Sequence, residues 1–187
     1  MAEQEYDMSI CDEINGLIQQ TDLSNVSANS TGYDELPFGY YRTKFSNVKV
    51  GRTRSTQTPM VTLTLEVLED GYKLNDATLQ FERIGGVTKR LIFKNYVIGD
   101  SKGLKSLVSD LKKVEDPTDN NVPILTDNDL KDFPSMWEFM KEFIKSEMYI
   151  WVHVRETTKK DGTKGSWTDL VSDSTALEAG LPNELLR

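Results

Sequence analysis

The stretch from residue 60 to 69, MVTLTLEVLE, alternates apolar and polar side chains along almost its whole length. Its apolar side chains share one side and are Val61, Leu63, Leu65 and Val67. A period of two residues is typical of a strand that buries one face, and β-branched residues favour this conformation. The chain is therefore expected to build its core on one face of a β-sheet.

Further segments have the character of strands and are 40–50, 77–86, 89–98, 148–156 and 166–173. The segment between the last two contains Lys160-Asp161-Gly162, which is a strong hairpin signal. The stretch DGYKLND, residues 70–76, is predicted to be a turn because it is polar and rich in turn-forming residues. The sequence thus predicts four strands, an interruption and a closing hairpin.

The interruption has helical periodicity. Residues 100–115 place four apolar side chains on one face, with Asp100 or Ser101 as the N-cap; these side chains are Leu104, Leu107, Val108 and Leu111. Residues 128–147 are predicted to form a second helical region that is broken near Pro134, after a loop over 116–129. Residues 11–20 are expected to form a short helix near the N-terminus.

This order of elements predicts a mainly β protein with helices, of the α+β class. Short strands with a helical insertion favour an OB-fold-like barrel of five to six strands, although a β-sandwich would give a similar pattern. We expect an acidic N-terminal arm with a short helix over 1–35, a binding domain over 36–173 with a helical insertion at about 100–147, and a mobile tail over 174–187.

The charges are distributed unevenly along the chain. The net charge is −8, yet residues 38–113 carry fourteen Lys or Arg and seven Asp or Glu. Residues 1–37 carry eight acids and no Lys or Arg, and residues 114–187 carry fifteen acids and eight Lys or Arg. A basic segment attracts polyanions. The simpler alternative is an ordinary scatter of surface charge.

Little in the sequence suggests catalysis, a cofactor or a metal. There is one histidine, His153, one cysteine, Cys11, and no glycine-rich phosphate loop. Three acids, Asp127, Asp129 and Asp132, form a nuclease-like Mg²⁺ alternative that ranks lowest, since acids also favour helix starts. No apolar run is long enough to span a membrane, and the N-terminus is not a secretory signal. A non-enzymatic cytoplasmic protein without cofactors is therefore expected.

The first strand combines cations with rings. Alternation places Tyr40, Arg42 and Lys44 on the face opposite Tyr41 and Phe45. Flat rings stack on bases and cations bind phosphates, which is the chemistry that binds single-stranded nucleic acid. The predicted binding residues are Tyr40, Arg42, Lys44, Arg52, Arg54, Lys89, Arg90, Lys94, Tyr96, Trp151 and Arg155. The rings Tyr40, Tyr96 and Trp151 are assigned to stacking, with burial in the core as the alternative for each.

The stretch YDELPFGYYRTKFSNVKV, the later EVLEDGYK and the hairpin KKDGTKGSWTDLV occur in an order that resembles phage-encoded single-stranded DNA-binding proteins with an OB fold. The resemblance covers roughly residues 33–172. It implies a groove formed by the 40–44 stripe, the 52–54 loop and the rings of the later strands.

The leading hypothesis is a sequence-nonspecific single-stranded DNA-binding protein of phage replication or recombination, in the cytoplasm of an infected bacterium. Its partners would be single-stranded DNA and replication or recombination proteins. The sequence is compatible with a homo-oligomer. The alternative is a protein-binding module, such as a DNA-mimic inhibitor of a host nucleic-acid enzyme that uses its acidic arms.

Overall fold

The protein is described here by a computed structural model that covers residues 8–21, 23, 36–116, 119–158 and 161–181. The helices are α1 (Met8–Gln20), α2 (Ser101–Leu111), α3 (Phe133–Lys145) and α4 (Asp173–Glu178). The strands are β1 (Gly39–Arg52), β2 (Pro59–Val67), β3 (Gly71–Asn75), β4 (Gln80–Ile84), β5 (Leu91–Val97), β6 (Glu115–Asp116), β7 (Asp119–Pro123), β8 (Tyr149–Thr158) and β9 (Lys164–Val171). The prediction of a mainly β protein with helices is confirmed, and the strands pair antiparallel.

The long strand β1 organises the main sheet, which has seven strands in the described part of the chain. One edge of β1 pairs with β2 from residue 43 to 52 and with β3 at Tyr40. Its other edge pairs with β8 from residue 39 to 44, and β9 follows β8. A register shift between Phe45 and Asn47 marks a bulge, which bends the strand so that its two halves serve different partners.

The sheet does not close into a barrel. Its outermost strands are β4, β5 and β9, and β5 pairs with β2 while β9 pairs with β8. Within the described residues no ladder joins β5 to β9. The expected OB-fold-like barrel of five to six strands is therefore not a closed one, and the main sheet has seven strands.

Two predictions about local structure are wrong for identifiable reasons. Residues 71–75 form β3 rather than a turn, because they pair with β4. The turn falls later, where the Asn75 side chain accepts hydrogen bonds from the backbone N–H groups of Ala77 and Thr78. The C-terminal residues were expected to be a mobile tail, yet they form α4, whose N-cap is Ser172. Residues 182–187 of that tail lie outside the described residues.

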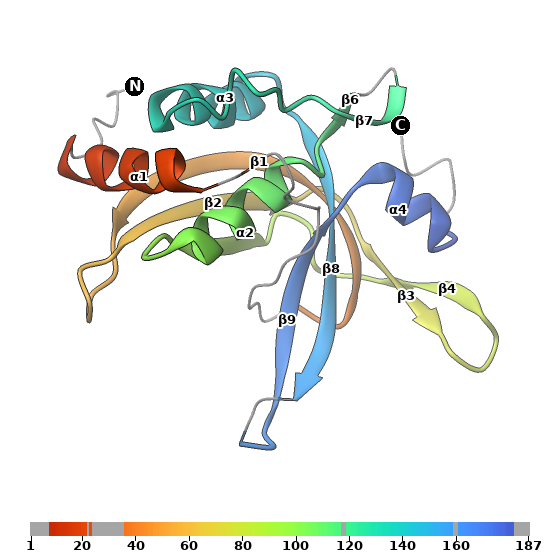
Figure 1. Cartoon of the computed structure of the whole chain (residues 1–187). Helices are drawn as coiled ribbons and strands as arrows, with labels where there is room; N and C mark the ends of the chain where they lie inside the picture. The colour runs from red at the N-terminus through yellow and green to blue at the C-terminus, as the bar shows by residue number, and fades with distance from the viewer. Residues whose placement is uncertain (1–7, 22, 24–35, 117–118, 159–160, 182–187) are drawn as a thin grey trace.

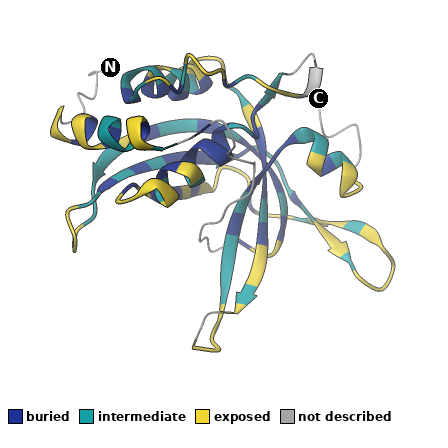
Figure 2. Cartoon of the chain, viewed as in Figure 1, coloured by how far each residue is buried: buried dark blue, intermediate teal, exposed yellow. Residues whose placement is uncertain are grey.

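Three helices cover one face of the sheet. α1 and α3 pack against each other, α2 packs against β5 and α1, and the β3–β4 and β8–β9 hairpins project away from α1 and α3 (Figure 1). The helices turn buried residues toward the sheet and exposed residues outward (Figure 2). α1 contributes Ile10, Ile14 and Ile18 to the main core, so this part of the predicted peripheral arm belongs to the folded body.

α2 begins in close contact with β5. A Cβ atom added at Gly103 would lie 2.0 Å from the carbonyl oxygen of Val97, so glycine is needed for this approach. Asp100 caps the helix by accepting a hydrogen bond from the Gly103 N–H, as the sequence predicts. In the described part of the chain, no helix is both long and apolar enough to cross a bilayer.

Candidate nucleic-acid interface

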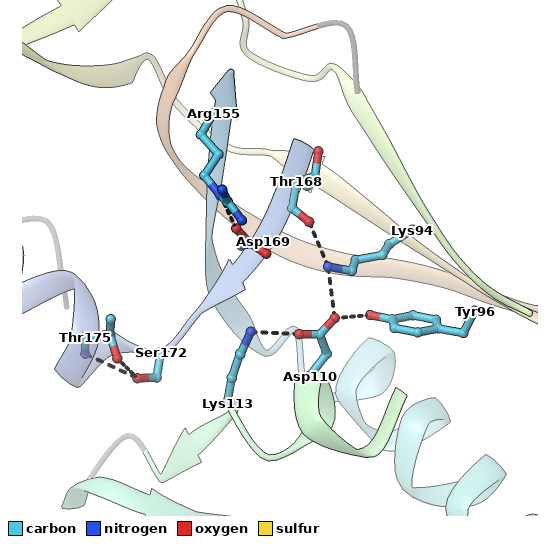
Figure 3. A network of polar contacts seen from close by, with 9 residues as sticks. All are labelled: Lys94, Tyr96, Asp110, Lys113, Arg155, Thr168, Asp169, Ser172 and Thr175. Carbon is cyan, nitrogen blue, oxygen red and sulfur yellow. Dashed lines mark hydrogen bonds and ion pairs between the residues drawn. The ribbon is translucent and has the colours of Figure 1, made fainter. Parts of the chain in front are cut away.

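Two predicted binding residues of β5 lie inside the protein. Lys94 is 1% exposed and Tyr96 is 3% exposed, because both point toward the helix layer. The Lys94 ammonium donates a hydrogen bond to the Thr168 carbonyl oxygen at 2.8 Å and lies 2.9 Å from a carboxylate oxygen of Asp110. Figure 3 shows these groups converging from β5, β9 and α2. Their assignment to DNA binding is wrong: Lys94 joins β5 to β9 through the Thr168 carbonyl, and Tyr96 joins β5 to α2 through Asp110.

Asp110 is the centre of this buried network. Its carboxylate accepts a hydrogen bond from the Tyr96 hydroxyl at 2.7 Å and another from the Lys113 ammonium at 2.8 Å (Figure 3). Burial lowers the pKa of Lys94, which the neighbouring Asp110 charge opposes, and burial together with Asp110 raises the pKa of Tyr96. Two buried ammonium groups therefore share one buried carboxylate.

The predicted stacking residue Trp151 is also fully buried. The C-terminal helix covers it, since Trp151 packs with Val171, Ala176 and Leu181. The stacking assignment of Trp151 is therefore wrong, and its stated alternative, burial, is what the structure has. The helix α4 covers this face of β8, in a part of the chain that was predicted to be a mobile tail.

Arg42 lies beneath the same helix and is 7% exposed. Its guanidinium carbon lies 5.4 Å from the ring centroid of Tyr149 and 5.5 Å from that of Trp151. One of its terminal nitrogens lies 3.6 Å from the carboxylate of Asp173 in α4. These contacts are cation–π and ionic, and they hold α4 on the sheet. Arg42 is not accessible to a nucleic acid in this arrangement.

Tyr40 is partly buried. Its ring stacks on the His153 imidazole with centroids 4.1 Å apart and planes inclined by 3°, and it meets Phe81 edge to face at 6.0 Å. Burial raises the pKa of the Tyr40 hydroxyl. His153 belongs to the β8–β9 hairpin and Phe81 to the β3–β4 hairpin, so Tyr40 packs these two hairpins together. Because His153 stacks on the Tyr40 ring, that face is not available to a base.

Three further predicted cations are held by acids. Arg52 lies 2.7 Å from Glu13 of α1 and also donates to the Ser9 hydroxyl, Lys44 lies 3.6 Å from Glu147, and Arg155 lies 2.7 Å from Asp169. Such surface pairs contribute little to stability and remain exchangeable. By contrast, Arg54, Lys89 and Arg90 are exposed and form no ion pair with any described residue.

A face of the sheet that no described helix covers lies around β5. We name this the open face, and its residues are Leu91, Phe93, Asn95 and Val97 of β5, Met60, Thr62 and Glu66 of β2, Lys44 and Lys49 of β1, and Tyr149 of β8. Leu91, Phe93 and Val97 are 48%, 53% and 46% exposed, and Tyr149 is 47% exposed. Soluble proteins rarely expose so many large apolar side chains on one strand without a partner.

The open face has an apolar centre along β5 with cations beyond both ends of this strand, and it also carries one acid, Glu66, across from Leu91. The exposed residues of β5 span about 20 Å along the strand. Lys89 and Arg90 precede this strip, and Arg54 lies in the β1–β2 turn beyond its other end. Lys49 lies across from Thr62, which donates a hydrogen bond to Asn95 beside Phe93. Rings and cations do therefore share one face, although the rings are Phe93 and Tyr149 and not those predicted.

The sequence offered only a weak signal for this choice. In LIFKNYV the two rings, Phe93 and Tyr96, are three residues apart and so lie on opposite faces. Both faces of the strand are mostly apolar, so alternation alone does not decide which is buried. The carboxylate of Asp110 in α2 decides it, because it provides a buried partner for Lys94.

A scan against protein-family models and a search of curated proteins found no match to this chain. The functional assignment rests on the geometry of the chain itself.

The acids of the nuclease alternative serve local structure. Asp132 caps α3 by accepting a hydrogen bond from the Ser135 N–H. Hydrogen bonding by the Ser135 side chain, together with that N–H, lowers the pKa of the Asp132 carboxyl group. Asp129 accepts hydrogen bonds from the N–H and hydroxyl of Thr126. Among the described residues, no three His, Cys, Asp or Glu side chains are grouped to hold a metal ion.

We expect His153 to make stability fall in mild acid. Burial lowers its pKa below the ordinary 6.5, with Arg155 acting in the same direction and Asp169 opposing. The unfolded chain therefore binds the proton more readily, and stability decreases as the pH falls below 6.5. Urea unfolding at pH 7.5 and pH 5.5 should show a smaller pH-dependent loss for His153→Phe, which keeps a ring beside Tyr40. An equal loss in both proteins would contradict this role.

Proposed function

We propose that the protein binds single-stranded DNA without strong sequence preference, through the open face. The observation that carries this proposal is the exposed Phe93 ring at the centre of an apolar strip with cations at both ends. Bases stack on aromatic rings whatever their identity, and the flanking cations pair with phosphates. The Thr62 hydroxyl already donates to Asn95, so this bond does not favour one base over another.

The order of strand pairing supports an OB-like arrangement. A bent first strand that pairs with its successor and with a late strand, plus helices inserted before that late strand, resembles an OB fold whose last seam is open. In this comparison β2 and β5 take the places of the second and third OB strands, whose outer face binds oligonucleotides. Phe93 lies on that outer face.

The charges favour a polyanion over a second copy of the chain. Both ends of the apolar strip carry cations that pair with no acid among the described residues, Lys89 and Arg90 at one end and Arg54 at the other. Two open faces brought together would oppose like charges in either direction, which is unfavourable. A nucleic-acid strand neutralises both ends at once. An apolar face also suits a protein partner. Binding to oligo-dT that weakens as salt rises would favour nucleic acid, and no binding at low salt would favour a protein.

The test is fluorescence anisotropy of a labelled oligo-dT titrated with the full chain at several salt concentrations. We expect binding that weakens as salt rises, with a slope of about −0.7 per phosphate contacted in a plot of log affinity against log salt. Double-stranded DNA of matched length should bind more weakly, since its bases are not free to stack. An anisotropy that stays flat at low salt would refute the proposed function. The internal tryptophans are a poor probe here, because Trp151 is buried.

A further inference from the structure

A second exposed ring lies on the open face, three strands away from Phe93. Residues that pair across neighbouring strands share one face of a sheet, so the strand pairings trace a row across it. This row crosses four strands, and its members in order are Leu91, Glu66, Lys44 and Tyr149. Phe93 lies two residues after Leu91 in β5 and therefore on the same face. The ladders thus place Tyr149 and Phe93 on one continuous surface.

The separation of these two rings suits one bound strand. Neighbouring strands of a sheet lie about 4.8 Å apart, and residues follow each other at about 3.4 Å along a strand. Three steps across the sheet and two along β5 therefore separate Phe93 from Tyr149 by about 16 Å along the surface. Stacked nucleotides rise about 3.4 Å each, so about five of them cover this span. This length lies within the range of about 4–16 nucleotides that one OB-type domain occupies.

Tyr149 is the outer member of a stack of rings around a cation. The Arg42 guanidinium lies 5.4 Å from the centroid of the Tyr149 ring and 5.5 Å from that of the buried Trp151 ring. Among the ring and cation contacts of the described residues, Arg42 is the one partner of Tyr149, which is 47% exposed. Cation–π attraction therefore holds the Tyr149 ring in place, and its exposed side can stack on a base.

The charges along this row make stacking the source of affinity at its far end. Lys44 lies 3.6 Å from Glu147 and directly opposite Glu66, so the middle of the row has no surplus of positive charge. The cations Lys89 and Arg90 precede β5, beside the Leu91 end of the row. A strand whose phosphates are held at that end would reach Tyr149 with its bases against the sheet.

We propose that Tyr149 stacks on a second base of the strand that lies against Phe93, so that the bound strand crosses from β5 over β2 and β1 to β8. The inference rests on the proposed function and deepens it. The proposed function needs only the strip along β5, whereas this inference extends the binding site across four strands of the sheet. It also gives the exposed ring at the start of β8 a binding role.

The first experiment separates the ring of Tyr149 from its hydroxyl group. Anisotropy across a salt series measures the affinity of labelled oligo-dT for Tyr149→Ala, which lacks the ring, and for Tyr149→Phe, which keeps it. Tyr149→Ala should weaken binding by about 5- to 150-fold, the loss of one stacked base. Its salt slope should not change, since no phosphate contact is removed. Tyr149→Phe should bind within about twofold of the unaltered chain.

The stoichiometry shows whether one strand meets both rings. An oligo-dT of about eight nucleotides is long enough to span them. It should bind once per chain in the unaltered protein, in Phe93→Ala and in Tyr149→Ala. Two oligonucleotides per chain, one of which is lost in each variant, would overturn the continuous path. Unchanged affinity in Tyr149→Ala, or equal losses in Tyr149→Ala and Tyr149→Phe, would overturn the stacking role and leave the proposed function intact. Failure of the unaltered chain to bind would remove both proposals.

Ultraviolet crosslinking of the unaltered chain to oligo-dT gives a further measurement that no folding defect affects. Mass spectrometry identifies the side chains that become joined to the oligonucleotide. Crosslinks at both Phe93 and Tyr149, with none at the exposed Phe38 away from β5, are the expected result. Crosslinks at Phe93 without any at Tyr149 would overturn the inference.

Discussion

Replacing Asp110 with Asn is expected to lower the free energy of unfolding by about 3–5 kcal/mol, the cost of leaving buried charges without their partner. The carboxylate is fully buried and serves both Lys94 and Lys113. Asparagine keeps the volume of the side chain, so the loss reports charge and not a cavity. Urea unfolding followed by circular dichroism measures the change, and Asp127→Asn, at an exposed loop position, is the matched control.

A second substitution shows whether the buried charge is the cause. Lys94→Met in the Asp110→Asn background removes one of the two buried ammonium groups that lose the Asp110 charge, and it should recover part of the stability. Such recovery is expected because uncompensated charge costs more than an apolar replacement of similar size. A single-variant loss below about 1 kcal/mol, or no recovery in the double variant, would show that the network does not hold the β5–β9 seam.

Replacing Phe93 with Ala is expected to weaken oligo-dT binding by about 5- to 150-fold, because one stacked base contributes about 1–3 kcal/mol. The ring is half exposed, so its removal should change the unfolding free energy little. The salt slope should stay the same, since no phosphate contact is lost. Anisotropy titrations at fixed salt measure the affinity.

Phe38→Ala is the control for this experiment. Phe38 is also exposed, at 39%, but it precedes β1 at the end where β8 pairs, away from β5. Its removal should leave affinity within about twofold of the unaltered chain. Comparable losses for Phe38→Ala and Phe93→Ala would exclude the open face as the stacking surface. Unchanged binding in Phe93→Ala would do the same.

The sequence determined the elements whose pattern is one-sided. The alternation of β2, with Val61, Leu63 and Leu65 buried, is as predicted, and so is the Asp100 cap of α2. These features follow from local periodicity and from hydrogen bonds within a few residues, so a single chain segment contains the information. The burial of Tyr41 and Phe45 opposite the Tyr40 stripe follows in the same way.

Which of the candidate binding residues are exposed depends on the tertiary structure. Arg42 and Trp151 lie on the predicted side of their strands, yet α4 arrives from the far end of the chain and covers them. In β5, alternation alone does not determine which of the two faces is buried. The carboxylate of Asp110, sixteen residues after Lys94, bonds Lys94 and Tyr96 inside the protein, so Phe93 lies on the exposed face. A residue's exposure depends on what packs against its face, and that neighbour is distant in sequence. Local pattern therefore determines which side chains share a face, and only the tertiary structure determines which face meets solvent.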